Sequence, residues 1–172
     1  MRRRYNYKRD LIISVEKMNK HIVKALSDYK FDFEKNYGYG IINGYEVNVY
    51  NSPFDVGPIF YFSTYLSESK KNEFVLKINQ KKLAFVYGYT FEFGVAVKIG
   101  AYTSSGFEKK FCNVLPIIFD ILQELGALKN NVCPQTGIAF DDYARVVVIP
   151  QYKIKVKLSS NGIKYINENY NN

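Results

Sequence analysis

Apolar residues recur at spacings of three and four in two stretches of the chain, which is the pattern of an amphipathic helix. The first stretch runs from Asp10 to Tyr29 and the second from Gly106 to Leu125. Gly126 supplies a left-handed stop after the second stretch, whereas Pro116 inside it predicts a kink or a later start. We expect a helix in each stretch, with one face packed on a core.

The residues between these helices alternate between apolar and polar types in several runs, which predicts β-strands. Asn43-Gly44 separates two such runs and is typical of a tight hairpin turn. Residues 67–82 fit both a strand and a helix, and we favour a helix because Ser67 and Glu68 suit its first turn. The remaining predicted strands are Ile59–Leu66, Leu83–Tyr89 and Phe91–Ile99.

The segment after residue 128 contains a further β-rich part. Arg145–Ile149 is followed by Lys153, Lys155 and Lys157, which alternate with apolar residues and therefore share one face. We interpret these lysines as charges that keep an edge strand from pairing with a second chain. The polar stretch from Ser159 is compatible with a short final helix.

The predicted element order is therefore α-β-β-β-α-β-β-α, an α+β fold with an antiparallel sheet, followed by a short C-terminal β extension. We divide the 172 residues into a basic N-terminal arm (1–9), an α+β core domain (10–128) and a C-terminal extension (129–172). The longest apolar run is far shorter than the roughly 20 residues of a membrane-spanning helix. We expect a cytoplasmic protein, with the inner face of the membrane as the alternative location.

The sheet carries more aromatic residues than one layer of helices can cover. Strands with rings on both faces cannot bury all of them against helices on one side. We therefore expect an open aromatic face that binds a protein partner or a second copy of the chain. Its predicted residues are Tyr61, Tyr65, Tyr87, Tyr89, Phe91 and Phe93.

The chain is basic, with 24 Lys and Arg residues against 16 Asp and Glu residues and a net charge of +8. A charge of this sign attracts phosphates and anionic lipid headgroups. Two interpretations of the N-terminal arm stay open: a disordered, solubilising terminus, or an arm that binds nucleic acid or an anionic membrane. Its predicted anion-binding residues are Arg2, Arg3, Arg4, Lys8 and Arg9.

Residues that hold metals or carry catalysis are scarce. Cys112, Cys133 and His21 are the only thiols and imidazole in the chain, fewer than the four ligands of a structural zinc site. The turn Cys133–Gly137 has threonine where a zinc knuckle has its second cysteine. We expect no metal, no cofactor and no enzymatic activity. The remaining alternative is a reactive Cys133 thiol, which needs a cation or a helix N-terminus beside it.

Two resemblances extend these predictions. The element order over Asp10–Gly126 resembles that of type III secretion chaperones and YbjN-type domains, which implies a chaperone-like binding role. The leucine-rich stretch Ile121–Leu128 followed by the Cys133–Gly137 turn resembles the N-terminal cytosolic domain of uncharacterised Gram-positive bacterial membrane proteins. In that family a stretch like Ile166-Asn167-Glu168 continues into membrane helices, which implies either a free-standing version or a missing membrane part.

The functional expectation is a non-enzymatic protein-binding domain, chaperone-like or an adaptor. The alternative is nucleic-acid or anionic-membrane binding through the basic arm. These alternatives differ in their response to salt, because phosphate-driven binding weakens steeply as the salt concentration rises.

Overall fold

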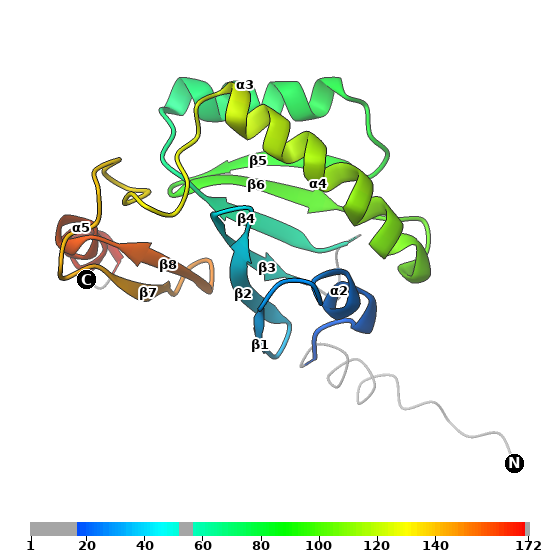
Figure 1. Cartoon of the computed structure of the whole chain (residues 1–172), viewed down its shortest axis with the longest axis horizontal. Helices are drawn as coiled ribbons and strands as arrows, with labels where there is room; N and C mark the ends of the chain where they lie inside the picture. Colours follow the sequence, from blue (N-terminus) through cyan, green and yellow to red (C-terminus); the bar gives the residue numbers. More distant parts are fainter. Residues whose placement is uncertain (1–16, 52–56, 171–172) are drawn as a thin grey trace, which may run out of the picture.

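The computed structural model describes residues 17–51 and 57–170 (Figure 1). The described helices are α2 (Lys20–Ala25), α3 (Glu68–Gln80), α4 (Phe107–Glu124) and α5 (Ser160–Tyr170), with a 3₁₀ turn at Ser104–Gly106. The described strands are β1 (Asp32–Glu34), β2 (Tyr37–Ile42), β3 (Tyr45–Tyr50), β4 (Ile59–Ser63), β5 (Val86–Phe91), β6 (Gly94–Ile99), β7 (Arg145–Ile149) and β8 (Ile154–Leu158).

Strands β1 to β6 of the described chain form one antiparallel sheet in the order β1-β2-β3-β4-β6-β5, and β7 and β8 form a separate hairpin. This arrangement confirms the α+β prediction. The predicted turn Asn43-Gly44 joins β2 to β3, and both residues have positive φ angles, 51° and 79°. Positive φ at both central residues is what a type I′ hairpin turn requires.

Helices α2, α3 and α4 contribute to the core on one face of the sheet. Figure 1 shows α3 and α4 lying together over β5 and β6. Phe60 of β4 is fully buried there, with its ring centroid 5.2 Å from that of Phe111 and 6.3 Å from that of Phe107 in α4. The predicted apolar stripe of this helix is confirmed, and α4 begins at Phe107, well before Pro116.

The opposite face of the sheet, here called the second face, is covered in part by the C-terminal extension. Phe91, Phe93 and Ala96 of the core domain are buried in one cluster with Val156 of β8 and Ile166 of α5. Figure 1 shows the hairpin and α5 on the left of the molecule, apart from α3 and α4 at the top. The extension therefore packs against the core domain and shares a buried apolar cluster with it.

Several strand boundaries differ from the prediction. β4 ends at Ser63 instead of Leu66, and β6 begins at Gly94 instead of Phe91. β5 begins at Val86 instead of Leu83, because Lys82 and Phe85 have positive φ angles of 51° and 60° and cannot continue a strand. β1 was not predicted, because three residues are too few to show an alternating pattern.

The N-terminal helix is also shorter than expected at its C-terminal end. In the described part, α2 ends at Ala25, four residues before Tyr29, and the N–H of Leu26 bonds back to the carbonyl of Ile22.

Among the described helices, none combines the length and the apolar character needed to cross a membrane.

Candidate binding site

The β7–β8 hairpin is fastened to the second face of the sheet by two buried side chains of β3. Asn48 Oδ1 accepts a hydrogen bond from the backbone N–H of Lys155, and Asn48 Nδ2 donates to the Lys155 carbonyl, both at 2.8 Å. The Glu46 carboxylate accepts from the backbone N–H of Lys157 at 3.0 and 3.1 Å. These side chains take the place that a neighbouring strand would occupy, and they satisfy both backbone groups of Lys155 and the N–H of Lys157 on the edge of β8 that faces the sheet.

Glu46 also links the hairpin to β2. Its Oε2 accepts a hydrogen bond from the Tyr39 hydroxyl at 2.7 Å. Burial raises the pKa of Glu46 above its ordinary value, although the hydrogen bonds from Tyr39 and Lys157 act in the opposite direction. Burial and the nearby Glu46 charge raise the pKa of Tyr39 as well, so this hydroxyl stays protonated and remains a donor.

Removing the Asn48 amide should detach β8 from the sheet. We expect Asn48→Ala to lower the free energy of unfolding by about 2 to 4 kcal/mol, because two backbone groups of Lys155 lose their partners in a buried place. Urea denaturation measures the change, and amide exchange at Lys155 should become faster. The matched control is Asn72→Ala on the exposed side of α3. Equal stability of the two variants would contradict this role for Asn48.

The raised pKa of Glu46 gives a pH dependence of stability with a defined sign. Folding favours the protonated form of the Glu46 carboxyl. The contribution of Glu46 to the free energy of unfolding is therefore fully present below the ordinary pKa of glutamate, and it is lost as pH rises through the folded-state pKa. The free energy of unfolding should fall with pH across this window, and Glu46→Gln should remove the fall. Urea denaturation at a series of pH values tests this, with exposed Glu34→Gln as the control. A pH slope unchanged by Glu46→Gln would refute the assignment.

A cleft of about 260 Å³ lies where the hairpin meets β1 and β2. Tyr37 and Tyr39 line it, with the Lys153 ammonium 5.6 Å from the Tyr37 ring centroid and the Lys155 ammonium 6.0 Å from that of Tyr39. Cation–π contacts of this kind hold the two lysines against the sheet. The complete lining is Asp32, Glu34, Lys35, Tyr37, Gly38, Tyr39, Asn48, Val148, Lys153 and Lys155.

The lining of the cleft combines both signs of charge with aromatic rings. Its two carboxylates and three lysines surround two phenol rings. In residues 17–51 and 57–170 there is no cluster of three or more His, Cys, Asp and Glu side chains that fits a metal ion.

β7 presents a free edge beside this cleft. The backbone groups of Lys155 and Lys157 point to β3, and their partners in register are Val148 and Val146. Opposed residues in an antiparallel pair either exchange both hydrogen bonds or direct them away from each other. Val146 and Val148 therefore direct their N–H and C=O groups away from β8, where no described residue bonds to them.

The two edges of the larger sheet are protected, in contrast to β7. On β5, the Val86 N–H bonds to the Leu83 carbonyl and the Gly88 N–H to Asn79 Oδ1. β1 has only three residues and carries exposed Asp32 and Glu34. Short strands, charges and covering groups are the usual means of blocking an edge. β7 has five residues, three of them consecutive valines.

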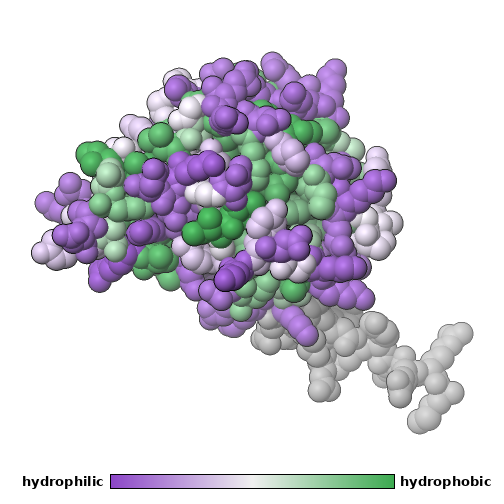
Figure 2. Space-filling view, in the orientation of Figure 1, coloured by the Kyte–Doolittle hydropathy of each residue, from purple (hydrophilic) through white to green (hydrophobic). Residues whose placement is uncertain are grey.

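The side chains of β7 are also exposed. Val146 is 46% and Val148 is 57% exposed. In Figure 2, apolar side chains reach the surface over the C-terminal extension, on the left, among polar ones. A strand of β-branched residues with an unpaired backbone and exposed side chains is the surface that pairs most readily with another strand.

The residues predicted for an open aromatic face divide into two groups. Tyr65, Tyr87 and Tyr89 are exposed, between 40% and 50%. Tyr61 is partly buried, with its ring centroid 5.3 Å from that of Phe91. The expectation of an open face is wrong for Phe91 and Phe93, which are buried under the extension.

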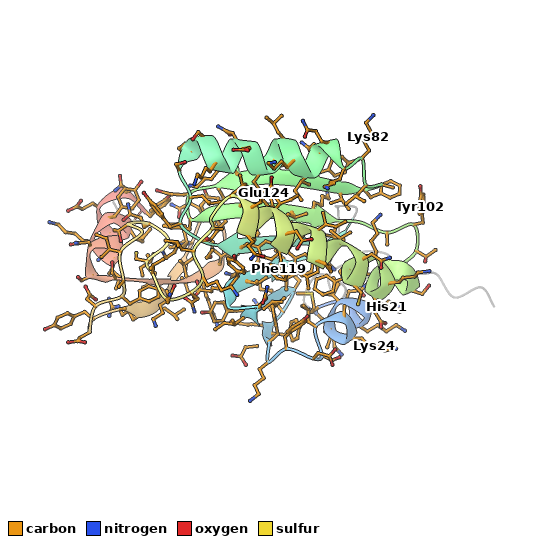
Figure 3. All side chains as sticks on the ribbon, turned by 45° about the horizontal axis from the view of Figure 1, so that its top comes forward. His21, Lys24, Lys82, Tyr102, Phe119 and Glu124 are labelled. Atoms are coloured by element: carbon orange, nitrogen blue, oxygen red, sulfur yellow. The ribbon has the colours of Figure 1, made fainter. Side chains whose placement is uncertain are left out.

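The remaining predicted residues are those of the N-terminal arm and His21. Arg2, Arg3, Arg4, Lys8 and Arg9 lie outside the described residues. His21, on α2, has its Nδ1 4.0 Å from Glu108 Oε1 of α4. Figure 3 shows His21 and Lys24 together beside the beginning of α4.

Cys133 is fully buried in the cluster beneath the extension. Burial raises the pKa of its thiol, but hydrogen bonds from Ser159 and Thr136 outweigh this effect and hold the pKa below the ordinary value. Thr136, which stands at the second cysteine of a zinc knuckle, is thus one of the residues that hold the sulfur. The sulfur also lies beside the first turn of α5, so the helix N-terminus that the reactive-thiol alternative requires is present, although the side chain has no exposed surface.

Comparison of the chain with known protein families, with curated proteins and with solved structures returned no match. The two resemblances drawn from element order and from the Cys133–Gly137 turn therefore remain predictions.

Proposed function

We propose that the chain is a non-enzymatic protein-binding domain that accepts an added β-strand at the free edge of β7. The observation that carries the proposal is the set of outward-facing backbone groups at Val146 and Val148, together with the exposure of their side chains. Strand addition uses such main-chain groups for affinity and the alternating side chains for specificity.

The surroundings of β7 suit an extended ligand. Val148 lies at the border of the cleft, so a strand beside β7 also reaches the lysines and tyrosines that line it. The buried Cys133 and the composition of the cleft provide no support for a catalytic role.

Capture experiments with matched variants test this proposal. Val148→Pro removes one outward N–H that β8 does not use, so the hairpin should persist while strand addition is lost. The control is Leu76→Lys, at a residue of α3 that is 60% exposed and distant in sequence from β7. Immobilised wild-type chain and Leu76→Lys should both retain one stoichiometric protein from a lysate of the source cells, and Val148→Pro should lose it.

Hydrogen exchange locates the contact. The amides of Val146 and Val148 should become protected when the captured protein, or a second copy of the chain, is present. If the chain binds no protein and does not self-associate, or if Val148→Pro binds as well as the wild type, the proposed function fails.

A further inference from the structure

We infer that the strand added at β7 is the β7 of a second copy of this chain, paired antiparallel about a two-fold axis at Val147. This inference rests on the proposed function and names its partner. A two-fold interface uses the same surface on both copies, so the edge of β7 must be complementary to itself. The register and the side chains each meet this condition.

The register is restricted by the backbone groups. With the axis at Val147, Val146 faces Val148 of the second copy, and the four outward N–H and C=O groups of each β7 are all paired. An axis at Val146 instead places Val148 opposite Ala144, whose N–H already bonds to the Asp141 carbonyl. An axis at Val148 places Val146 opposite Pro150, which has no N–H. Each of these two registers therefore leaves an outward carbonyl of β7 without a donor.

The side chains suit the same register. Val146 and Val148 lie on one face of the hairpin, and the axis at Val147 brings each of them beside a valine of the other copy. Directly opposed β-branched residues are favourable cross-strand pairs. Of the lysines expected to protect an edge, Lys153 precedes β8, whereas Lys155 and Lys157 lie on β8, which faces the sheet. The Lys157 ammonium is 4.4 Å from the centroid of the Phe140 ring. β7 itself carries no lysine.

The ends of β7 carry both signs of charge. Asp141 and Asp142 precede the strand, Arg145 begins it, and Lys153 follows it. Antiparallel pairing brings all three of the former toward Lys153 of the other copy, so attraction and repulsion both act there and the register rests on the backbone groups and the valines. The resulting sheet, β8-β7-β7-β8, has four strands, whereas a two-stranded hairpin has limited stability of its own.

The net charge of +8 on each chain opposes this association. Because salt screens the repulsion between two like-charged chains, dimerisation should become stronger as the salt concentration rises. This direction is opposite to that of phosphate-driven binding. Salt dependence therefore separates the dimer from association mediated by contaminating nucleic acid.

Sedimentation equilibrium of the full chain over micromolar to millimolar concentrations tests the dimer. We expect a monomer–dimer equilibrium for the wild type and for Leu76→Lys. Val148→Pro and Val148→Lys should each weaken dimerisation by about tenfold or more, through the lost donor and through the added charge respectively. Val148→Lys keeps the backbone donor and guards against a folding defect in Val148→Pro. A wild type that stays monomeric, or dimerisation equal in all four proteins, overturns the inference.

A single cysteine on the axis tests the register. Residues opposed in a non-hydrogen-bonded antiparallel pair have Cα atoms about 4.5 Å apart, within the range of a disulfide. In a Cys112→Ser background, because Cys112 is exposed, Val147→Cys should form a covalent dimer on mild oxidation. Arg145→Cys, which faces Ile149 of the other copy, should not. The reverse result, or no covalent dimer from Val147→Cys, overturns the register proposed here.

The two proposals fail in different ways. If the chain is monomeric but still captures another protein in a manner that Val148→Pro abolishes, the dimer is wrong and the binding function at β7 stands. If neither association occurs, both are wrong.

Discussion

Gly94→Ala should lower the free energy of unfolding by about 3 kcal/mol or more, an effect larger than that of most single substitutions. A Cβ at this position would lie 2.1 Å from the Phe62 carbonyl oxygen and 3.0 Å from the Thr64 nitrogen. Both atoms belong to the backbone of β4 and the residues after it. Relief of the clash requires β4 and β6 to separate, which breaks the ladder between them.

Urea denaturation of Gly94→Ala and Gly106→Ala provides a matched comparison. At Gly106 an added Cβ would lie 3.2 Å from one atom only, the Thr103 hydroxyl oxygen, on the exposed approach to α4. We expect this control to change stability little. If Gly94→Ala is as stable as Gly106→Ala, the described pairing of β4 with β6 is incorrect.

Phe93→Ala should lower the free energy of unfolding by about 3 to 5 kcal/mol, as is usual for removal of a fully buried phenylalanine. Phe93 is completely buried between the second face and the extension. Its loss leaves a cavity in the cluster that also contains Ile154 and Val156 of the hairpin. The extension should therefore detach more readily than the sheet unfolds.

Limited proteolysis separates these two effects. In Phe93→Ala, cleavage within the connection between residues 128 and 145 should be faster under conditions in which the core domain is still folded. Tyr87→Ala is the control, because Tyr87 is half exposed on β5. An unchanged cleavage rate in Phe93→Ala would show that the extension does not depend on this cluster.

Local patterns in the sequence were sufficient to predict most of the larger sheet. Asn43-Gly44 determines a turn type by its own backbone preference, and the apolar stripe of α4 repeats over five turns. Both signals lie within a few residues of the structure that they specify. β1 carries no comparable signal, because its three residues pair with β2 only through the tertiary fold.

The cover of the second face was not predicted, because the contacts that form it join distant parts of the chain. Asn48 and Lys155 are 107 residues apart, and no local pattern links them. A signal was nevertheless present: Phe91 and Phe93 needed a cover, and Ile154, Val156 and Leu158 form an apolar face on the extension. These two apolar surfaces together predict that the extension packs on the second face of the sheet.

The candidate site was predicted only in part. The sequence predicts a β-rich segment at β7, but it also predicts that Lys153, Lys155 and Lys157 protect an exposed edge, whereas β8 faces the sheet. The order of strands in space decides which edge is free, and sequence periodicity does not encode it. Exposure of Tyr65, Tyr87 and Tyr89 was anticipated because one layer of helices cannot cover both faces of a sheet.

The fastening of the hairpin by Asn48 and Glu46 has a consequence during protein synthesis. All the strands of the larger sheet leave the ribosome before Arg145, the first residue of the hairpin. A nascent chain therefore holds a nearly complete sheet in which Phe91 and Phe93 are not covered. The side chains of Asn48 and Glu46 also lack their hydrogen-bond partners on β8. This intermediate is the species most prone to aggregate. Premature termination before Arg145 should accordingly yield insoluble protein rather than a smaller folded domain.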